Sequence, residues 1–136
     1  MGFDLEFDAK NNILRGALEG PVTDSLLLDC YEAAARYATS HPQCRGLWDF
    51  SQVTSFGLSP DAVTEVATRS PIIAAGYMRV VVAPQDFIFG MMRMLQILSE
   101  ETRPELHVVR TLNEAYRLFC VESPEFRPVN WLRNGN

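Results

Sequence analysis

A run of three valines, Val80 to Val82, constrains the fold more than any other segment of this chain. The run lies between Arg79 and Ala83, and Pro84 follows it directly. A short, continuous apolar run that stops at a proline is typical of a central strand covered on both faces. Such strands belong to parallel sheets, which need helical crossover connections between one strand and the next. The segment therefore predicts an α/β fold.

The rest of the pattern predicts strands that alternate with helices. Two alternating apolar segments flank residues 10–12 and indicate an opening antiparallel hairpin. The order that follows is helix, strand, helix, strand, helix, strand, helix. We expect a mixed, mostly parallel sheet of about five strands with about four helices. Residues 1–122 would form a single domain, and residues 123–136 would form an extended tail.

Residue types at the expected helix starts support this order. Thr23, Ser59 and Asp86 stand where N-cap residues are preferred, and Pro60 fits the first helical position. The third helix is expected to run from Asp86 to about Glu101.

Composition and charge disfavour several classes of protein. The net charge is −5, and the eleven arginines and the single lysine form no basic stripe, which disfavours a nucleic-acid partner. No segment approaches the roughly 18 unbroken apolar residues of a membrane span. Cys30, Cys44 and Cys120 are odd in number and lie among core-type residues, which indicates free thiols in a reducing compartment. We therefore expect a cytoplasmic protein with no membrane span.

No catalytic constellation can be read from the sequence. His41 and His107 have no carboxylate or cysteine at metal-ligand spacing, and no Gly-x-Ser-x-Gly nucleophile elbow occurs. Glu100 and Glu101 are adjacent, so on a helix they would point about 100 degrees apart and form a poor acid–base pair. We therefore expect a protein that is not an enzyme and that uses no metal or cofactor.

The segment Arg45–Asp61 predicts the first candidate functional surface. It reads as a buried strand that runs into a polar loop and then onto a helix start, which suits a switch or a contact. Ser59 is the main candidate phosphoacceptor, because backbone N–H groups and the helix dipole favour a phosphate at a helix N-terminus. Thr54 and Ser55 are lesser candidates. The alternative is that Ser59 only caps the helix.

The expected third helix predicts the second candidate surface. Phe89, Arg93 and Ile97 fall at i, i+4 and i+8, and a ridge of this composition is typical of a contact surface. Met91 and Met94 suit an adaptable groove or an apolar ligand. The opposite, core-facing side would hold seven apolar residues: Phe87, Ile88, Met91, Met92, Met94, Leu95 and Leu98.

Two classes of function fit these surfaces. The first is a non-enzymatic interaction or regulatory module that binds a protein partner or itself, most simply as a homodimer. The second is a binding protein or sensor for a small apolar ligand beneath the third helix, with the Ile72–Gly76 loop as a lid. A cavity of roughly a few hundred Å³ would favour the second class. Alternatively, the Ile72-Ile73 loop, or the tail through Phe126 and Trp131, covers the ridge.

The element order, together with Asp49-Phe50-Ser51-x-Val53-Thr54 at the end of the third strand, resembles STAS domains, the anti-sigma-factor-antagonist fold. Over roughly residues 3–121 the chain looks most like the SpoIIAA-like branch of small bacterial proteins. This second resemblance is carried by residues 18–23, 83–90 and 110–115. It implies a cytoplasmic protein that acts through protein–protein contacts.

In STAS antagonists the loop continues into Asp-Ser-Ser-Gly, whose first serine is phosphorylated by a partner kinase. Here the four corresponding positions read Gly57-Leu58-Ser59-Pro60. The phosphoacceptor position holds Leu58, and Ser59 is shifted by one residue.

Overall fold

A mixed sheet with helices on both faces forms the protein. The computed structural model describes residues 2–69, 71–74 and 76–129. In this part of the chain there are six strands and four helices. In order they are β1 (Phe3–Asp8), β2 (Ile13–Thr23), α1 (Asp24–Thr39), β3 (Arg45–Gly57), α2 (Pro60–Thr68), β4 (Arg79–Val82), α3 (Asp86–Leu98), β5 (Leu106–Val109), α4 (Leu112–Phe119) and β6 (Arg127–Pro128).

The strand order in the sheet is β5-β4-β3-β2-β1-β6. β2, β3, β4 and β5 run parallel to one another, and β1 is antiparallel to β2. This confirms the predicted α/β fold, the mostly parallel sheet, the opening hairpin and the four helices. The sixth strand comes from the segment predicted to be a tail, since Arg127 pairs with Phe7 and Pro128 with Glu6. β6 thereby covers the edge of the sheet that β1 would otherwise expose.

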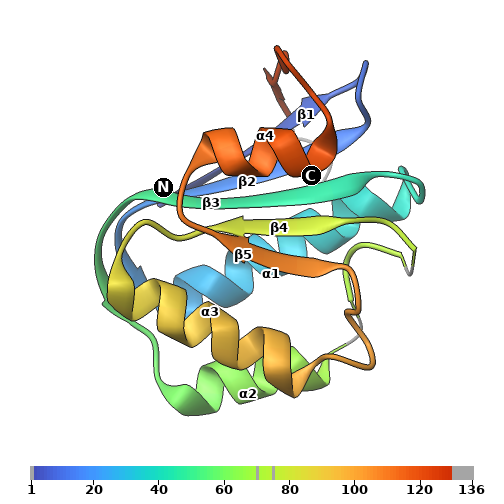
Figure 1. The fold of residues 1–136 in the computed structure, drawn as a ribbon. Helices are drawn as coiled ribbons and strands as arrows, with labels where there is room; N and C mark the ends of the chain where they lie inside the picture. Colours follow the sequence, from blue (N-terminus) through green and yellow to red (C-terminus); the bar gives the residue numbers. More distant parts are fainter. Residues whose placement is uncertain (1, 70, 75, 130–136) are drawn as a thin grey trace.

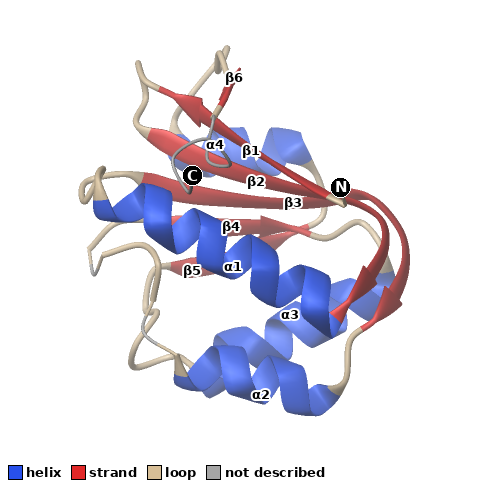
Figure 2. Ribbon diagram, turned by 180° about the vertical axis from the view of Figure 1, so that it is seen from behind, coloured by secondary structure: helices blue, strands red, loops and turns tan. Residues whose placement is uncertain are grey.

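The helices form two unequal layers (Figures 1 and 2). α1, α2 and α3 lie on one face of the sheet, and α4 lies on the other. The parallel strands β2 to β5 are added in one direction, and right-handed connections then put the three intervening helices on one face. No helix in the described part of the chain is long and apolar enough to cross a membrane.

The core has two parts, one on each face of the sheet. All four residues of β4 are buried, as the valine run predicts. Val81 packs into the cluster under α1 to α3, whereas Val80 and Val82 pack into the smaller cluster under α4. This alternation follows from the two-residue period of a strand. The strand must be apolar on both faces because each face supports its own core.

The predicted helix starts are confirmed at two of three positions. The Thr23 hydroxyl oxygen accepts a hydrogen bond from Leu26 N at 3.2 Å, and the Ser59 hydroxyl oxygen accepts one from Ala62 N at 3.1 Å. For α3 the predicted cap at Asp86 is wrong.

Gln85 is the N-cap residue of α3, and it makes no side-chain capping bond. Its amide nitrogen instead donates to the carbonyl oxygens of Phe50 and Val53 on β3, at 3.2 and 3.0 Å. Asp86 becomes the first helical residue, where its carboxylate pairs with Arg110 at 2.7 Å.

α3 also ends three residues earlier than predicted, at Leu98 rather than near Glu101. Ser99 is its C-cap, and the Ser99 backbone N–H donates to Leu95 O. The Ser99 carbonyl oxygen then accepts from Arg103 N at 2.7 Å, which turns the chain toward β5.

The predicted polar loop after β3 is largely strand, which corrects the first candidate surface. β3 continues to Gly57 because its end pairs with the end of β2, through Gly20↔Val53 and Thr23↔Gly57. A register shift follows Gly20, whose φ of +71° is a conformation that glycine adopts without strain. The two strand ends project together past the rest of the sheet, on the right of Figure 2.

A substitution at the centre of the smaller cluster tests this packing. Leu47 is fully buried on β3, so Leu47→Ala should lower the free energy of unfolding by about 2–5 kcal/mol. Leu118 on α4 is partly exposed, so Leu118→Ala should change it by less than about 0.5 kcal/mol. Urea unfolding followed by circular dichroism measures both. Equal stability of the two variants would contradict the two-sided core.

Candidate functional site

A groove lies between the far end of β3 and the start of α3. Its volume is about 330 Å³, and the ring of Phe56 meets the ring of Phe87 edge-on at 5.8 Å between centroids. The groove brings part of the predicted switch segment, Thr54 and Ser55, beside the predicted contact helix. Its lining is Val53, Thr54, Ser55, Phe56, Gln85, Phe87 and Ile88.

The core-facing side of α3 is narrower than predicted. Only Ile88 and Met92 are buried, and Met91, Met94 and Leu95 are half-buried. The prediction that Phe87 and Leu98 face the core is wrong, because their side chains are 60% and 52% exposed.

α3 covers the outer part of the sheet and packs beside α2, so its remaining surface has no described element over it (Figure 1). Ile97 is 67% exposed on this outward side. Gly90 is exposed there too, and a Cβ at this position would meet nothing within 4 Å. We call Phe87, Gly90, Met94, Ile97 and Leu98 the α3 surface.

The three residues of the predicted ridge differ in exposure. Arg93 and Ile97 are exposed as expected, but Phe89 is half-buried and packs against the larger core cluster. The guanidinium of Arg110 lies over the Phe89 ring, 3.9 Å from its centroid. Phe89 therefore packs against the core, and the guanidinium of Arg110 covers its ring, which the sequence did not predict.

The predicted covering segments are placed differently. Phe126 packs into the smaller cluster on the α4 side of the sheet, away from α3. Ile73 is buried in the larger cluster, and Ile72 packs against it. Trp131 lies outside the described residues.

The Ser59 hydroxyl both donates and accepts a hydrogen bond within the fold. The hydroxyl donates to Asp24 Oδ2 at 3.2 Å while it caps α2, and the Ser59 backbone N–H donates to Asp24 Oδ1 at 3.2 Å. These bonds join the starts of α1 and α2. A phosphate here would meet the Asp24 carboxylate and be repelled by it. The geometry therefore favours the capping role, and Leu58, at the position of the STAS phosphoacceptor, is buried.

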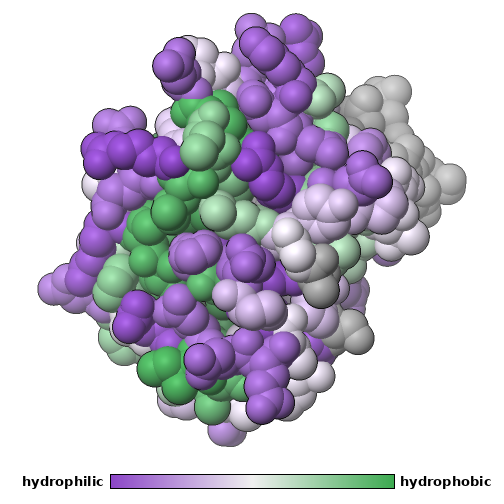
Figure 3. All heavy atoms as spheres, turned by 45° about the vertical axis from the view of Figure 1, so that its right-hand side comes forward, coloured by the Kyte–Doolittle hydropathy of each residue, from purple (hydrophilic) through white to green (hydrophobic). Residues whose placement is uncertain are grey.

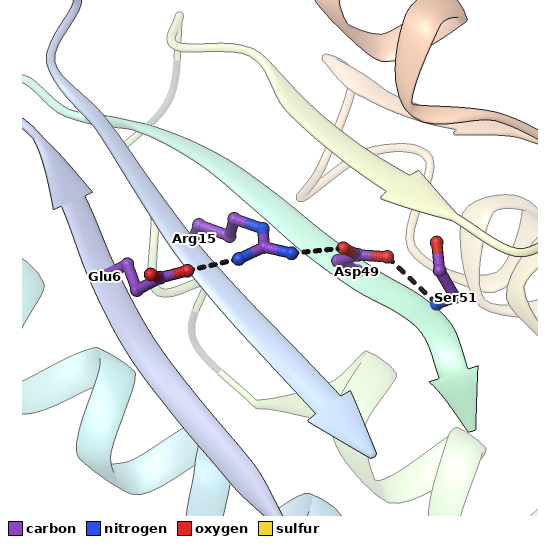
Figure 4. Close-up of polar contacts among 4 residues, drawn as sticks. All are labelled: Glu6, Arg15, Asp49 and Ser51. Atoms are coloured by element: carbon purple, nitrogen blue, oxygen red, sulfur yellow. Dashed lines mark hydrogen bonds and ion pairs between the residues drawn. The ribbon is translucent and has the colours of Figure 1, made fainter. Parts of the chain in front are cut away.

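A chain of charged side chains crosses the sheet on the other face (Figure 4). Arg15 on β2 pairs with Glu6 on β1 and, at 2.6 Å, with Asp49 on β3. Asp49 is 2% exposed, and its second carboxylate oxygen accepts from Ser51 N at 2.9 Å. Burial acts to lower the pKa of Arg15, but Asp49 and Glu6 outweigh it, so the pKa is raised.

This network ties three adjacent strands together and places no nucleophile beside a base. The ring of Phe126 lies 5.7 Å from the Arg15 guanidinium carbon, which adds apolar cover. Sequence reasoning missed the network, although a charged Asp49 inside an apolar strand is a signal that a partner is needed.

A cavity of about 90 Å³ lies between the sheet and helices α1 to α3. It is smaller than the few hundred Å³ expected of a ligand site, yet the third helix does not close completely over the sheet. Its lining is mostly apolar and includes Trp48, Phe50 and Met92. Two arginines, Arg79 and Arg103, also line it, and nothing in the sequence pattern predicted them there.

Cys30 lines the same cavity, and burial raises the pKa of its thiol to about 12. A thiol held neutral in this way is a poor nucleophile. Cys30, Cys44 and Cys120 are all free thiols, as predicted. In the described residues no three His, Cys, Asp or Glu side chains are grouped to hold a metal ion.

No protein-family model matches this chain, and a search of curated proteins finds no match either. The groove, the α3 surface and the cavity are therefore the features from which a function can be inferred.

The buried thiol predicts a pH dependence of stability. The pKa of Cys30 is about 12 in the folded protein and near 9.0 without burial, so its contribution is complete below pH 9 and is lost as the pH rises toward 12. Cys30→Ala removes this contribution. Between pH 8 and pH 10 the wild type should lose about 1.4 kcal/mol more unfolding free energy than the variant.

Urea unfolding at the two pH values measures this difference. Cys120 is exposed, so Cys120→Ala is the matched control and should follow the wild type. If Cys30→Ala also follows the wild type, the thiol is not held neutral by burial.

Proposed function

We propose that this protein is a non-enzymatic interaction module that associates with a second copy of itself through α3 and the adjoining groove. The observation that carries the proposal is the exposure of Phe87, Ile97 and Leu98 on one helix, beside a groove of about 330 Å³. Single exposed apolar residues are ordinary, whereas a cluster of large ones is typical of an interaction site. Figure 3 gives one view of apolar residues gathered on an otherwise largely hydrophilic surface.

The composition of α3 favours self-association. Between Asp86 and Leu98 the helix carries one further charge, Arg93, so two copies would meet with little repulsion. Gly90 lies one helical turn from both Phe87 and Met94. A glycine at this point allows two helix backbones to approach closely, while the large apolar residues pack around the contact.

The resemblance to STAS antagonists agrees with this proposal, because those proteins act through protein contacts. The proposed self-association does not require phosphorylation of Ser59. Thr54 and Ser55 line the groove and are exposed, so a modification there would add charge beside Phe87 and weaken the contact.

Charged substitutions on the α3 surface test the proposal. Light scattering over a range of concentrations should give the wild type a mass of two chains. Phe87→Asp with Ile97→Asp should give the mass of one chain, because both positions would place a charge inside the contact. Leu118→Asp, on the opposite face of the sheet, is the control and should stay dimeric.

A wild type of one-chain mass at every concentration would refute self-association. Gly90→Ala adds a second readout. On an unpartnered helix the change should raise the free energy of unfolding by about 0.5–1 kcal/mol. At a close helix contact it should weaken the dimer instead, so a dimer of unchanged affinity would place the contact elsewhere.

A second candidate function is binding of a small ligand in the cavity beneath α3. The observation that favours it is the incomplete closure between the sheet and Met92, which leaves about 90 Å³. Native mass spectrometry after gentle purification should then show a fraction of the protein with a small added mass. That fraction should disappear when Cys30→Leu fills the cavity, and bare polypeptide alone in the wild type would count against this function.

A further inference from the structure

The most unusual charged group on the cavity wall is Arg79, which is 2% exposed. It begins β4 and shares a face of that strand with Val81, so its side chain lies on the side of α1 to α3. Its Nη2 donates to the carbonyl oxygens of Ile73 and Ala74. Its Nε and Nη1 have no hydrogen-bond acceptor among the described residues.

Unpaired donors on a buried cation are costly. An arginine does not give up its proton in a protein, so it cannot escape the cost by becoming neutral. Burial lowers the pKa of Arg79, and the charge of Arg103 lowers it further, whereas Glu105 and Tyr31 act to raise it. Within the described chain no carboxylate forms an ion pair with Arg79, Glu105 included.

Arg103, the second buried arginine, is compensated by the end of a helix. It donates to Val66 O at 3.1 Å, Ala67 O at 3.3 Å and Arg69 O at 3.2 Å, which lie at the C-terminal end of α2. The negative end of a helix dipole favours a cation at this place. Arg103 also donates to the Tyr31 hydroxyl oxygen at 3.3 Å.

The cavity is therefore lined mostly by apolar side chains, with two arginines among them. Arg79 supplies the donors that are left over, and Arg103 adds positive potential nearby. An apolar ligand would leave those donors unpaired, and an inorganic anion would leave the apolar wall unfilled. A ligand with a compact apolar body and one negative group satisfies both requirements.

We propose that the cavity binds a small monocarboxylate, with its carboxylate on Arg79 and its apolar body against Trp48, Phe50 and Met92. This inference rests on the second candidate function and names the chemistry of the ligand. A cavity of about 90 Å³ sets an upper limit on size, since roughly 150 Å³ holds benzene. The ligand must therefore be smaller than benzene, which admits the shortest aliphatic acids, such as acetate, and excludes branched and long-chain acids.

The test compares an acid with its neutral counterpart of the same shape. Acetate and acetamide are titrated separately into the ¹⁵N-labelled 136-residue chain, with sodium phosphate as a third probe. Acetate should shift the backbone amide signals of residues around the cavity and bind at least tenfold more tightly than acetamide. Phosphate should bind at least tenfold more weakly than acetate, because it has no apolar body.

Two variants separate the contribution of the Arg79 charge to ligand affinity from that of the cavity volume. Arg79→Met replaces the guanidinium by an unbranched apolar side chain, so acetate should lose at least tenfold in affinity while acetamide changes little. Cys30→Leu fills the cavity and should abolish binding of both probes. The wild-type comparison needs no variant, so it decides the matter even if Arg79→Met folds poorly.

The outcomes are distinguishable. Equal affinity for acetate and acetamide would overturn the assignment of an acid and leave the cavity as a ligand site. Phosphate binding as tightly as acetate would overturn the need for an apolar body and make this a simple anion site. Binding of none of the three probes would overturn both the acid and the cavity as a binding site, and would leave the proposed self-association through α3 untouched.

Discussion

The parallel pairing of β2 with β3 is the constraint on which the rest of the structure depends. It runs from Ile13↔Arg45 to Thr23↔Gly57 and joins the antiparallel hairpin to the parallel part of the sheet. On the α4 face it brings Arg15 beside Asp49, and at its far end it supplies one wall of the groove. Without this pairing, neither the charged network nor the groove would form, because each takes its residues from segments that are distant along the chain.

Two arginines, one half-buried and one fully buried, show how the same side chain serves different purposes in one small domain. Arg15 has two carboxylate partners, and these offset the cost of burying its charge. Arg79 has backbone carbonyl oxygens only, and two of its nitrogen atoms lack acceptors among the described residues. The surroundings of Arg15 are those of a structural ion pair, whereas the unsatisfied donors of Arg79 are those expected at a ligand site. This contrast is the physical basis for the proposed carboxylate site.

α3 connects the two proposals because it has a packed side and an exposed side. Ile88 and Met92 close the larger core, and Met92 and Leu95 line the cavity, whereas Ile97 and Phe87 face outward. A contact on the outer side would hold the helix in place and thereby affect entry to the cavity beneath it. Self-association and ligand binding would then be coupled through one rigid element. Each can nevertheless be measured separately, because the residues involved lie on different sides of the helix.

The sequence by itself determined the order of elements, the central strand at Val80–Val82, and the helix caps at Thr23 and Ser59. These signals are local, since apolar periodicity and capping depend on residues a few positions apart. Only the tertiary structure decided that β3 continues to Gly57, and that the tail adds a sixth strand. It also decided that Arg79 lines a cavity with two donor nitrogens that have no acceptor among the described residues. Each of these features depends on which distant segment supplies the neighbouring backbone or side chain. A local sequence pattern does not identify that segment.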